Sequence, residues 1–424
     1  MFSTKEIMNF KDKIVDKFKS NKAVIENYIF MTILQILNSL FYIIIYPYVI
    51  RVLGVENYGI YIYTVSIVTY FIFLINFGFD FPATKAVAEN KDNVKALNDI
   101  LSYIFTAKIY LQILSSIIFC ILIFSIPFLR NNKLIYFIIY LQTFANILFP
   151  QWYYQGLQKM KTVTIIQVVF KLISLPFIFI FVKKVTDLSL FATVTTFTML
   201  AGAMISFLMI RYQDGFKIKL ISFNKTKSWF KQGTPFFLST SVGVFKEQGV
   251  TIAIGAFFGM KDVAIYDLAN KIVIIPRTLL MSVNAAMFPK IVIEAKKHVI
   301  KKIIKYEFIL GILVMIFIAI FGKWVIQLLG GEAMISAYPL SIILSFTVVS
   351  WLVVGAYISF VFIPNNKNYF VVQNQLVALI SVVVFSLIGY IFSNSIFILI
   401  CALALSGLAE IIFCYYKTFK NNLL

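Results

Sequence analysis

Residues 303–320 read IIKYEFILGILVMIFIAI, and this run does not alternate between polar and apolar side chains. Residues 117–127, IIFCILIFSIP, form a second run of the same kind. A strand of a membrane barrel would alternate, whereas a membrane-spanning helix needs about 20 mostly apolar residues in succession. Only helices and closed barrels satisfy every backbone group in lipid. The two runs therefore predict an all-α polytopic membrane protein.

The composition extends this prediction to the whole chain. Of its 424 residues, 61% are hydrophobic and only 13% are charged. A soluble domain is about half apolar and about a quarter charged. At about 20 residues a span, this apolar content is enough for about twelve crossings. The polar breaks place these spans at 26–50, 59–79, 101–127, 134–154, 164–182, 189–210, 230–258, 263–289, 304–329, 336–362, 369–391 and 394–416.

The distribution of basic residues predicts the orientation. Most of the 38 Lys and Arg lie in the amino-terminal segment and in every second connection between the expected spans. Because cytoplasmic loops carry the excess of Lys and Arg, we expect both ends of the chain in the cytoplasm. Residues 1–22, with six Lys, are expected to form a basic amphipathic segment on that surface. The net charge of +20 then needs no nucleic-acid partner.

A basic connection at 211–229 divides the chain into two halves of six expected spans, 23–210 and 230–424. Residues 53–61, LGVENYGIY, and 258–266, FGMKDVAIY, lie at the first turn of each half and have similar sequences. Two halves with six spans each predict parallel repeats related by an axis along the membrane normal. We therefore expect two pseudo-symmetric six-helix bundles around a central cavity.

The residue types needed for catalysis are scarce. His298 is the one histidine and lies in a basic connection, and the three Cys lie in apolar runs. No glycine-rich phosphate loop of the form GxxxxGK[ST] occurs. We therefore expect no enzyme activity, no metal site and no cofactor, but a transport protein driven by a gradient or by its substrate.

Charged side chains at membrane depth are costly and typically line a substrate path or pair with one another. The expected substrate-binding cations are Arg277, Lys246, Lys108, Lys171, Lys271 and, at the outer mouth, Arg51. The expected carriers of a coupling proton or cation are Glu410, Glu247 and Asp267. The five deep cations exceed these acids in number, which favours an anionic substrate such as phosphate or pyrophosphate.

Alternative roles remain open for several of these residues. Lys108 and Lys171 could extend their side chains to the membrane surface, and Arg51 could serve the end of its helix. Asp267 and Lys271 are four residues apart, the spacing of an ion pair within one helix. Glu410, like Glu26 and Glu307, could equally be a helix-packing residue.

Three stretches of sequence, in their order and placement, resemble one bacterial family. They are residues 47–54 (PYVIRVLG) with 58–61 (YGIY), 76–79 (NFGF) with 82–88 (PATKAVA), and 151–156 (QWYYQG) with Met160. The chain resembles the polysaccharide repeat-unit flippases, the Wzx family of the multidrug, oligosaccharidyl-lipid and polysaccharide exporter superfamily. The local motifs cover about a tenth of the chain, whereas the number and polarity of the spans agree throughout.

This resemblance implies two bundles that give alternating access to a central cationic cavity. It implies transport of oligosaccharide repeat units on undecaprenyl pyrophosphate from the inner to the outer leaflet of the bacterial cytoplasmic membrane, for O-antigen or capsule. Membrane lipid and the polysaccharide polymerase machinery would be partners. Two alternatives are a cation-coupled multidrug extruder, with a more acidic or apolar cavity, and a flippase for the peptidoglycan lipid precursor, which often has more spans.

Overall fold

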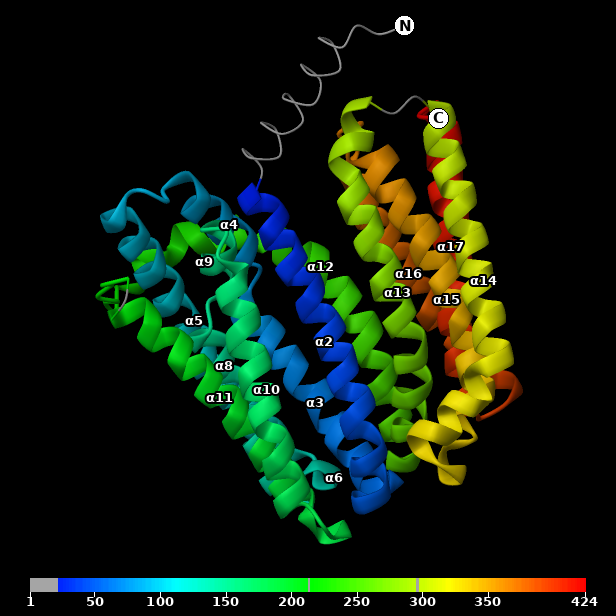
Figure 1. Ribbon diagram of the computed structural model, residues 1–424. Helices are drawn as coiled ribbons and strands as arrows, with labels where there is room; N and C mark the ends of the chain where they lie inside the picture. The colour runs from blue at the N-terminus through cyan, green and yellow to red at the C-terminus, as the bar shows by residue number, and fades with distance from the viewer. Residues whose placement is uncertain (1–21, 213, 295–296) are drawn as a thin grey trace, which may run out of the picture.

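The computed structural model describes residues 22–212, 214–294 and 297–424, and this part of the chain is helical, with no strands (Figure 1). The amphipathic segment expected at 1–22 lies outside the described residues, apart from Lys22 at the start of the first helix. The described chain begins and ends at the same end of the molecule (Figure 1).

The first half of the chain, blue to green in Figure 1, contains both long helices and short ones. Its elements are α2 (Lys22–Leu53), α3 (Val55–Asn76), α4 (Asp80–Glu89), α5 (Val94–Ser125), α6 (Pro127–Arg130), α7 (Lys133–Tyr140), α8 (Gln142–Leu148), α9 (Gln151–Gly156), α10 (Met160–Phe181), η1 (Val185–Asp187) and α11 (Leu188–Tyr212).

The second half, green to red in Figure 1, consists mainly of long helices. Its elements are α12 (Phe223–Phe257), α13 (Met260–Glu294), α14 (Lys297–Gly330), η2 (Glu332–Met334), α15 (Ala337–Tyr357) with a π-helical extension η3 (Ile358–Phe362), α16 (Asn368–Phe392) and α17 (Ile396–Lys420).

One expected span, 134–154, is broken into α7, α8 and α9. Phe149 adopts φ −108° and ψ 82°, outside the helical region. The ring of Pro150 disfavours a helical conformation at the preceding residue and cannot donate a backbone hydrogen bond. The backbone therefore leaves the helix at Phe149 and re-enters it at Gln151.

Ten segments of the described chain are long and apolar enough to cross a membrane, which supports a multi-pass membrane protein. The two remaining expected spans, 230–258 and 263–289, lie on α12 and α13, which are each 35 residues long but are not among the ten. These two helices carry Lys246, Glu247, Asp267, Lys271 and Arg277 well inside the expected spans. Twelve crossings and the repeat symmetry thus stay predictions.

The two halves meet where α3 packs along α13 and α2 packs against α14. At the end of the molecule opposite the termini, a Cβ atom on Gly59 would lie 1.8 Å from the carbonyl oxygen of Met260, so that only glycine fits there. Gly54 and Gly259, with φ 79° and 105°, begin the two turns in a conformation that favours glycine. The two similar sequences, 53–61 and 258–266, therefore touch one another.

Candidate functional site

Two cavities are lined by the charged residues predicted from the sequence, with the exception of Arg51. The first, called here the N-half cavity, has a volume of about 510 Å³ and lies among helices of the first half. The second, called here the central cavity, has a volume of about 200 Å³ and lies between α3 and the second-half helices α12, α13, α15 and α17. Because α3 lines both cavities, it forms part of the wall between them.

The central cavity contains as many acidic as basic side chains. Its charged lining residues are Lys246, Glu247, Asp267, Lys271, Arg277 and Glu410. The sequence led us to expect an excess of cations, and this cavity on its own has none. The pairing of these charges therefore decides what the cavity can bind.

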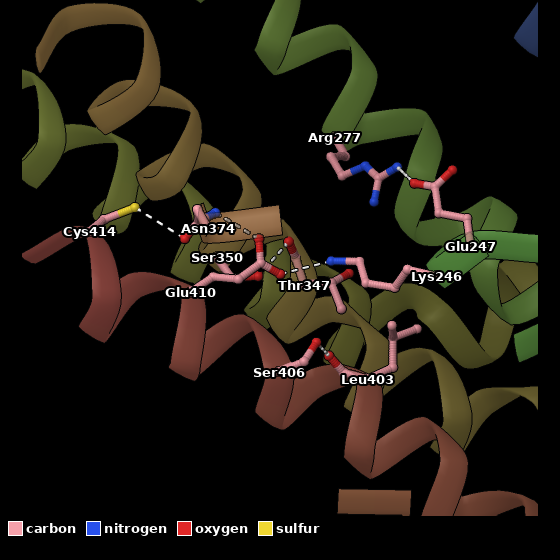
Figure 2. Close-up of polar contacts among 10 residues, drawn as sticks. All are labelled: Lys246, Glu247, Arg277, Thr347, Ser350, Asn374, Leu403, Ser406, Glu410 and Cys414. Atoms are coloured by element: carbon pink, nitrogen blue, oxygen red, sulfur yellow. Dashed lines mark hydrogen bonds and ion pairs between the residues drawn. The ribbon is translucent and has the colours of Figure 1, made fainter. Parts of the chain in front are cut away.

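Lys246 and Glu410 form a buried ion pair between α12 and α17 (Figure 2). The Lys246 Nζ lies 2.7 Å from the Glu410 Oε1, and the two side chains are 6% and 9% exposed. Asn374 on α16 donates a hydrogen bond of 3.3 Å to the other carboxylate oxygen. The Cys414 thiol in turn donates to the Asn374 side-chain oxygen. This network joins three helices of the second half.

Arg277 and Glu247 form a second ion pair, with 3.5 Å between the guanidinium and the carboxylate. The Arg277 guanidinium also lies 4.1 Å from the centre of the Trp351 ring, a cation–π contact. Lys246 and Glu247 are adjacent on α12, yet Figure 2 shows their side chains reaching in different directions, toward α17 and α13. Their opposite charges thus serve two separate pairs.

Asp267 connects the two halves. Its carboxylate accepts hydrogen bonds from the Tyr58 hydroxyl at 3.0 Å and from the Tyr42 hydroxyl at 3.3 Å, on α3 and α2. Lys271 instead lies over the Tyr42 ring, 5.3 Å from its centre. The ion pair considered between Asp267 and Lys271 is not found among the ion pairs of the described residues.

Lys108 lines the N-half cavity, and its ammonium group contacts two residues of the first half. Its ammonium donates to the Asn76 side-chain oxygen at 2.9 Å and lies 3.5 Å from the Asp80 carboxylate. The alternative of a side chain extended to the membrane surface does not apply, because this side chain is 4% exposed. Asp80 was missed from the sequence because it follows the expected end of the second span, directly after the motif NFGF.

Lys171 lies in the N-half cavity on the side that approaches the central cavity. Its ammonium donates to the Asn38 side-chain oxygen and lies 5.4 Å from the centre of the Phe41 ring. Lys271 lies over the ring of Tyr42, four residues after Asn38 on the same helix α2. Lys171 belongs to the first half and Lys271 to the second, so one ammonium group from each half contacts this part of α2.

The five deep cations therefore fall into two groups. Three of them, Lys108, Lys246 and Arg277, lie within ion-pair distance of a carboxylate. Lys171 and Lys271 form no ion pair with any described residue. Arg51 lines neither cavity and donates to the Leu328 carbonyl at 3.2 Å, at an exposed helix end, as its alternative role predicts.

Comparison with known proteins identifies the family. A family model described as polysaccharide biosynthesis protein matches residues 24–293, well over half of the chain. The chain belongs to this family. A relative from Escherichia coli (strain K12), named "Putative O-antigen transporter", is 25% identical over 265 residues. That match covers 62% of this chain and 64% of the relative, so just under two thirds of the relative's length is spanned.

Solved structures of other proteins share the fold of this family member. A structure of the lipid II flippase MurJ in an inward closed conformation has a TM-score of 0.67 at 13% identity, covering 93% of this chain and 87% of the other. An inward-facing multidrug resistance transporter of the MATE family has a TM-score of 0.65 at 12% identity, covering 94% and 98%. The expected superfamily fold is confirmed, whereas identities this low carry nothing about substrates.

Proposed function

We propose that this protein is a flippase for oligosaccharide repeat units carried on undecaprenyl pyrophosphate. It moves them from the inner to the outer leaflet of the bacterial cytoplasmic membrane, with both chain ends in the cytoplasm, for the synthesis of a surface polysaccharide. Membership of the polysaccharide biosynthesis family and the likeness to a protein named as an O-antigen transporter support this proposal.

The observation that carries the proposal is that Lys171 and Lys271 contact Asn38 and Tyr42, four residues apart on α2, and that neither forms an ion pair with a described residue. In a protein interior of low dielectric, two such ammonium groups favour an anion that both can contact. A pyrophosphate offers several oxygens and more than one negative charge, so it can accept hydrogen bonds from both Lys side chains. Asn38 and Tyr42, which contact these ammonium groups, line the same place.

Alternating access then follows from which contacts join the halves. Tyr58 and Tyr42 hold Asp267 across the interface, and Gly59 lies against Met260 at the end opposite the termini. Separation of these contacts would open that end, while the ion pairs within the second half keep its helices together. The lipid tail remains in the bilayer throughout, because transfer of its apolar surface into a charged cavity would be costly.

The carboxylates of the cavities argue against an extruder of organic cations. Each acidic lining residue already has a partner: Asp80 has Lys108, Glu247 has Arg277, Glu410 has Lys246, and Asp267 has two tyrosines. A cationic drug would have to break one of these contacts before a carboxylate could bind it. A peptidoglycan precursor carries the same pyrophosphate, so this alternative requires a direct test.

The test uses a strain that lacks the gene and is complemented either with the wild-type gene or with a variant. It compares the export of lipid-linked repeat units between these strains. Lys171→Met and Lys271→Met should each reduce outward flux of lipid-linked repeat units by about 10- to 100-fold, since a hydrogen bond to a charged group contributes about 1.5–3 kcal/mol. Lys183→Met, at an exposed position between α10 and η1, is the matched control.

Two outcomes would count against the proposal in different ways. Normal export of repeat units in the deletion strain would rule out the function, and a block in peptidoglycan synthesis instead would favour the alternative substrate. Normal export with both Lys variants would leave the function standing but would rule out this anion site.

A further inference from the structure

The N-half cavity differs in chemistry from the central cavity. Apart from Lys171 and the paired Lys108 and Asp80, its polar lining is uncharged. Five side-chain amides contribute to it, those of Asn76, Gln142, Asn146, Gln151 and Gln167. Each such amide carries both hydrogen-bond donors and an acceptor, so the lining suits a ligand that offers both.

Several of these amides are available to a ligand. Gln142 donates one hydrogen bond to Thr196 at 3.1 Å, and Asn76 accepts one from Lys108. The side chains of Asn146 and Gln167 form no hydrogen bond with any described residue, although both line the cavity. A polar group at membrane depth that lacks a partner carries a free-energy cost, which a polar ligand would remove.

Aromatic side chains supply the rest of the lining. They are Phe41, Tyr61, Phe149, Trp152 and Phe170. An aromatic face carries partial negative charge and packs against the weakly positive C–H groups of a ring. Sugars present apolar C–H faces and hydroxyl edges that both donate and accept hydrogen bonds. Amides and aromatic faces together therefore match a sugar better than a phosphate or an alkyl chain.

We infer that the N-half cavity binds the sugars nearest the pyrophosphate of the lipid-linked oligosaccharide. This inference rests on the proposed function and adds to it a separate site for the glycan. Lys171 lines this cavity and contacts Asn38, while Lys271 lies over Tyr42 four residues further along α2, so a pyrophosphate held by both lysines places its first sugar at the cavity. Its volume of about 510 Å³ lies within the range of about 300–1,000 Å³ usual for small-molecule sites.

The amides then determine which glycan is accepted. A site built to hydrogen-bond particular hydroxyls discriminates strongly against an analogue that lacks them, because its own polar groups are left unpaired. Asn146 lies on α8 and Gln167 on α10. Because the two amides come from different helices, they can hydrogen-bond hydroxyls at two different positions of the sugar. The Lys pair, in contrast, contacts a group that every such lipid carries.

The experiment measures binding of two lipids to the purified full-length protein in nanodiscs. The first is undecaprenyl pyrophosphate without sugar, and the second is the lipid-linked oligosaccharide extracted from the strain that lacks the gene. The variants are Asn146→Leu and Gln167→Met, which remove hydrogen bonding with little change in volume. The matched control is Gln373→Met on α16, exposed and outside both cavities.

The wild-type protein should bind the glycan lipid more tightly than the bare lipid. The double variant should bind the glycan lipid about 10- to 30-fold more weakly, as expected for two neutral hydrogen bonds, and the bare lipid as tightly as before. The unchanged affinity for the bare lipid also shows that the variant is folded.

Unchanged affinity for the glycan lipid, or an equal loss for both lipids, would overturn the inference, because the amides would then not contact sugar. Failure of the proposed function would look different. In that case the wild-type protein itself would bind neither lipid, and the deletion strain would export repeat units normally.

Discussion

Loss of either charge in the Lys246–Glu410 pair should lower the free energy of unfolding by about 3–5 kcal/mol, the usual cost of leaving one buried charge without its partner. The two side chains are 6% and 9% exposed, so neither can turn to water without moving a helix. We expect Glu410→Leu to cost more than Lys246→Met. Asn374 would still donate to Glu410 in the second variant, whereas Lys246 would lose its one carboxylate partner in the first.

The distance between the charges sets the size of the effect. At 2.7 Å and an effective dielectric constant of about 20, the attraction amounts to about 6 kcal/mol. Part of this attraction is offset by the free energy of removing both ions from water. The double variant Lys246→Met with Glu410→Leu removes the attraction and the desolvation cost together. It should therefore be less destabilised than the sum of the two single variants, by about 2 kcal/mol or more.

The assay is reversible unfolding by SDS in mixed micelles, carried out for the wild-type protein, both single variants and the double variant. Lys183→Met is the control for loss of a surface charge and should change the free energy of unfolding by less than about 0.5 kcal/mol. A coupling energy near zero, with the double variant destabilised by the full sum of the single variants, would refute the assignment of a buried pair.

Three further predictions concern the contacts between the halves. Asp267→Asn weakens the hydrogen bond from Tyr58 by about 1 kcal/mol, which should increase the population of the separated state about fivefold in distances between spin labels on the two halves. Gly59→Ala places a methyl group on the Met260 carbonyl, so the same distances should lengthen and export should fall; unchanged distances would contradict the packing. Arg51→Ala should leave export normal, since its side chain serves only a carbonyl at an exposed helix end.

The positions of the helices could be predicted from the sequence because a span is a local property. A run of apolar residues that crosses lipid must pair its own backbone groups, which favours a helix. The expected spans lie mostly on helices, and 134–154 is the one that the structure divides into several short helices. The break at Phe149 was missed although Pro150 signals it, because the run on both sides is apolar. The spans on α12 and α13 were expected from apolar runs between polar breaks, and the charged residues within them line the central cavity.

The pairing of charges could not be predicted, because partners come from distant parts of the chain. Asp267 has Lys271 four residues away, yet it accepts hydrogen bonds from Tyr58, which is 209 residues away. The carboxylate that pairs with Lys246 belongs to Glu410, 164 residues away in the sequence. A count of charges in the spans therefore named residues that line the two cavities, Arg51 excepted, but it could not show that Lys108, Lys246 and Arg277 lie within ion-pair distance of a carboxylate. Their role as a binding site stays a prediction.

Under the proposed function, Lys171 and Lys271 bring one ammonium group from each half to the same part of α2, and this makes the empty and the loaded protein mechanically different. Without a ligand, repulsion between one charge on each half opposes their approach; a shared anion replaces this repulsion with two attractions. The ligand thus changes the free-energy difference between two states, one with the halves separated and one with the halves in contact. Any ligand that binds one of two states more tightly shifts the equilibrium toward that state. A carrier that returns empty would then avoid the arrangement that brings the two lysines together, and this preference would weaken as salt screens the charges.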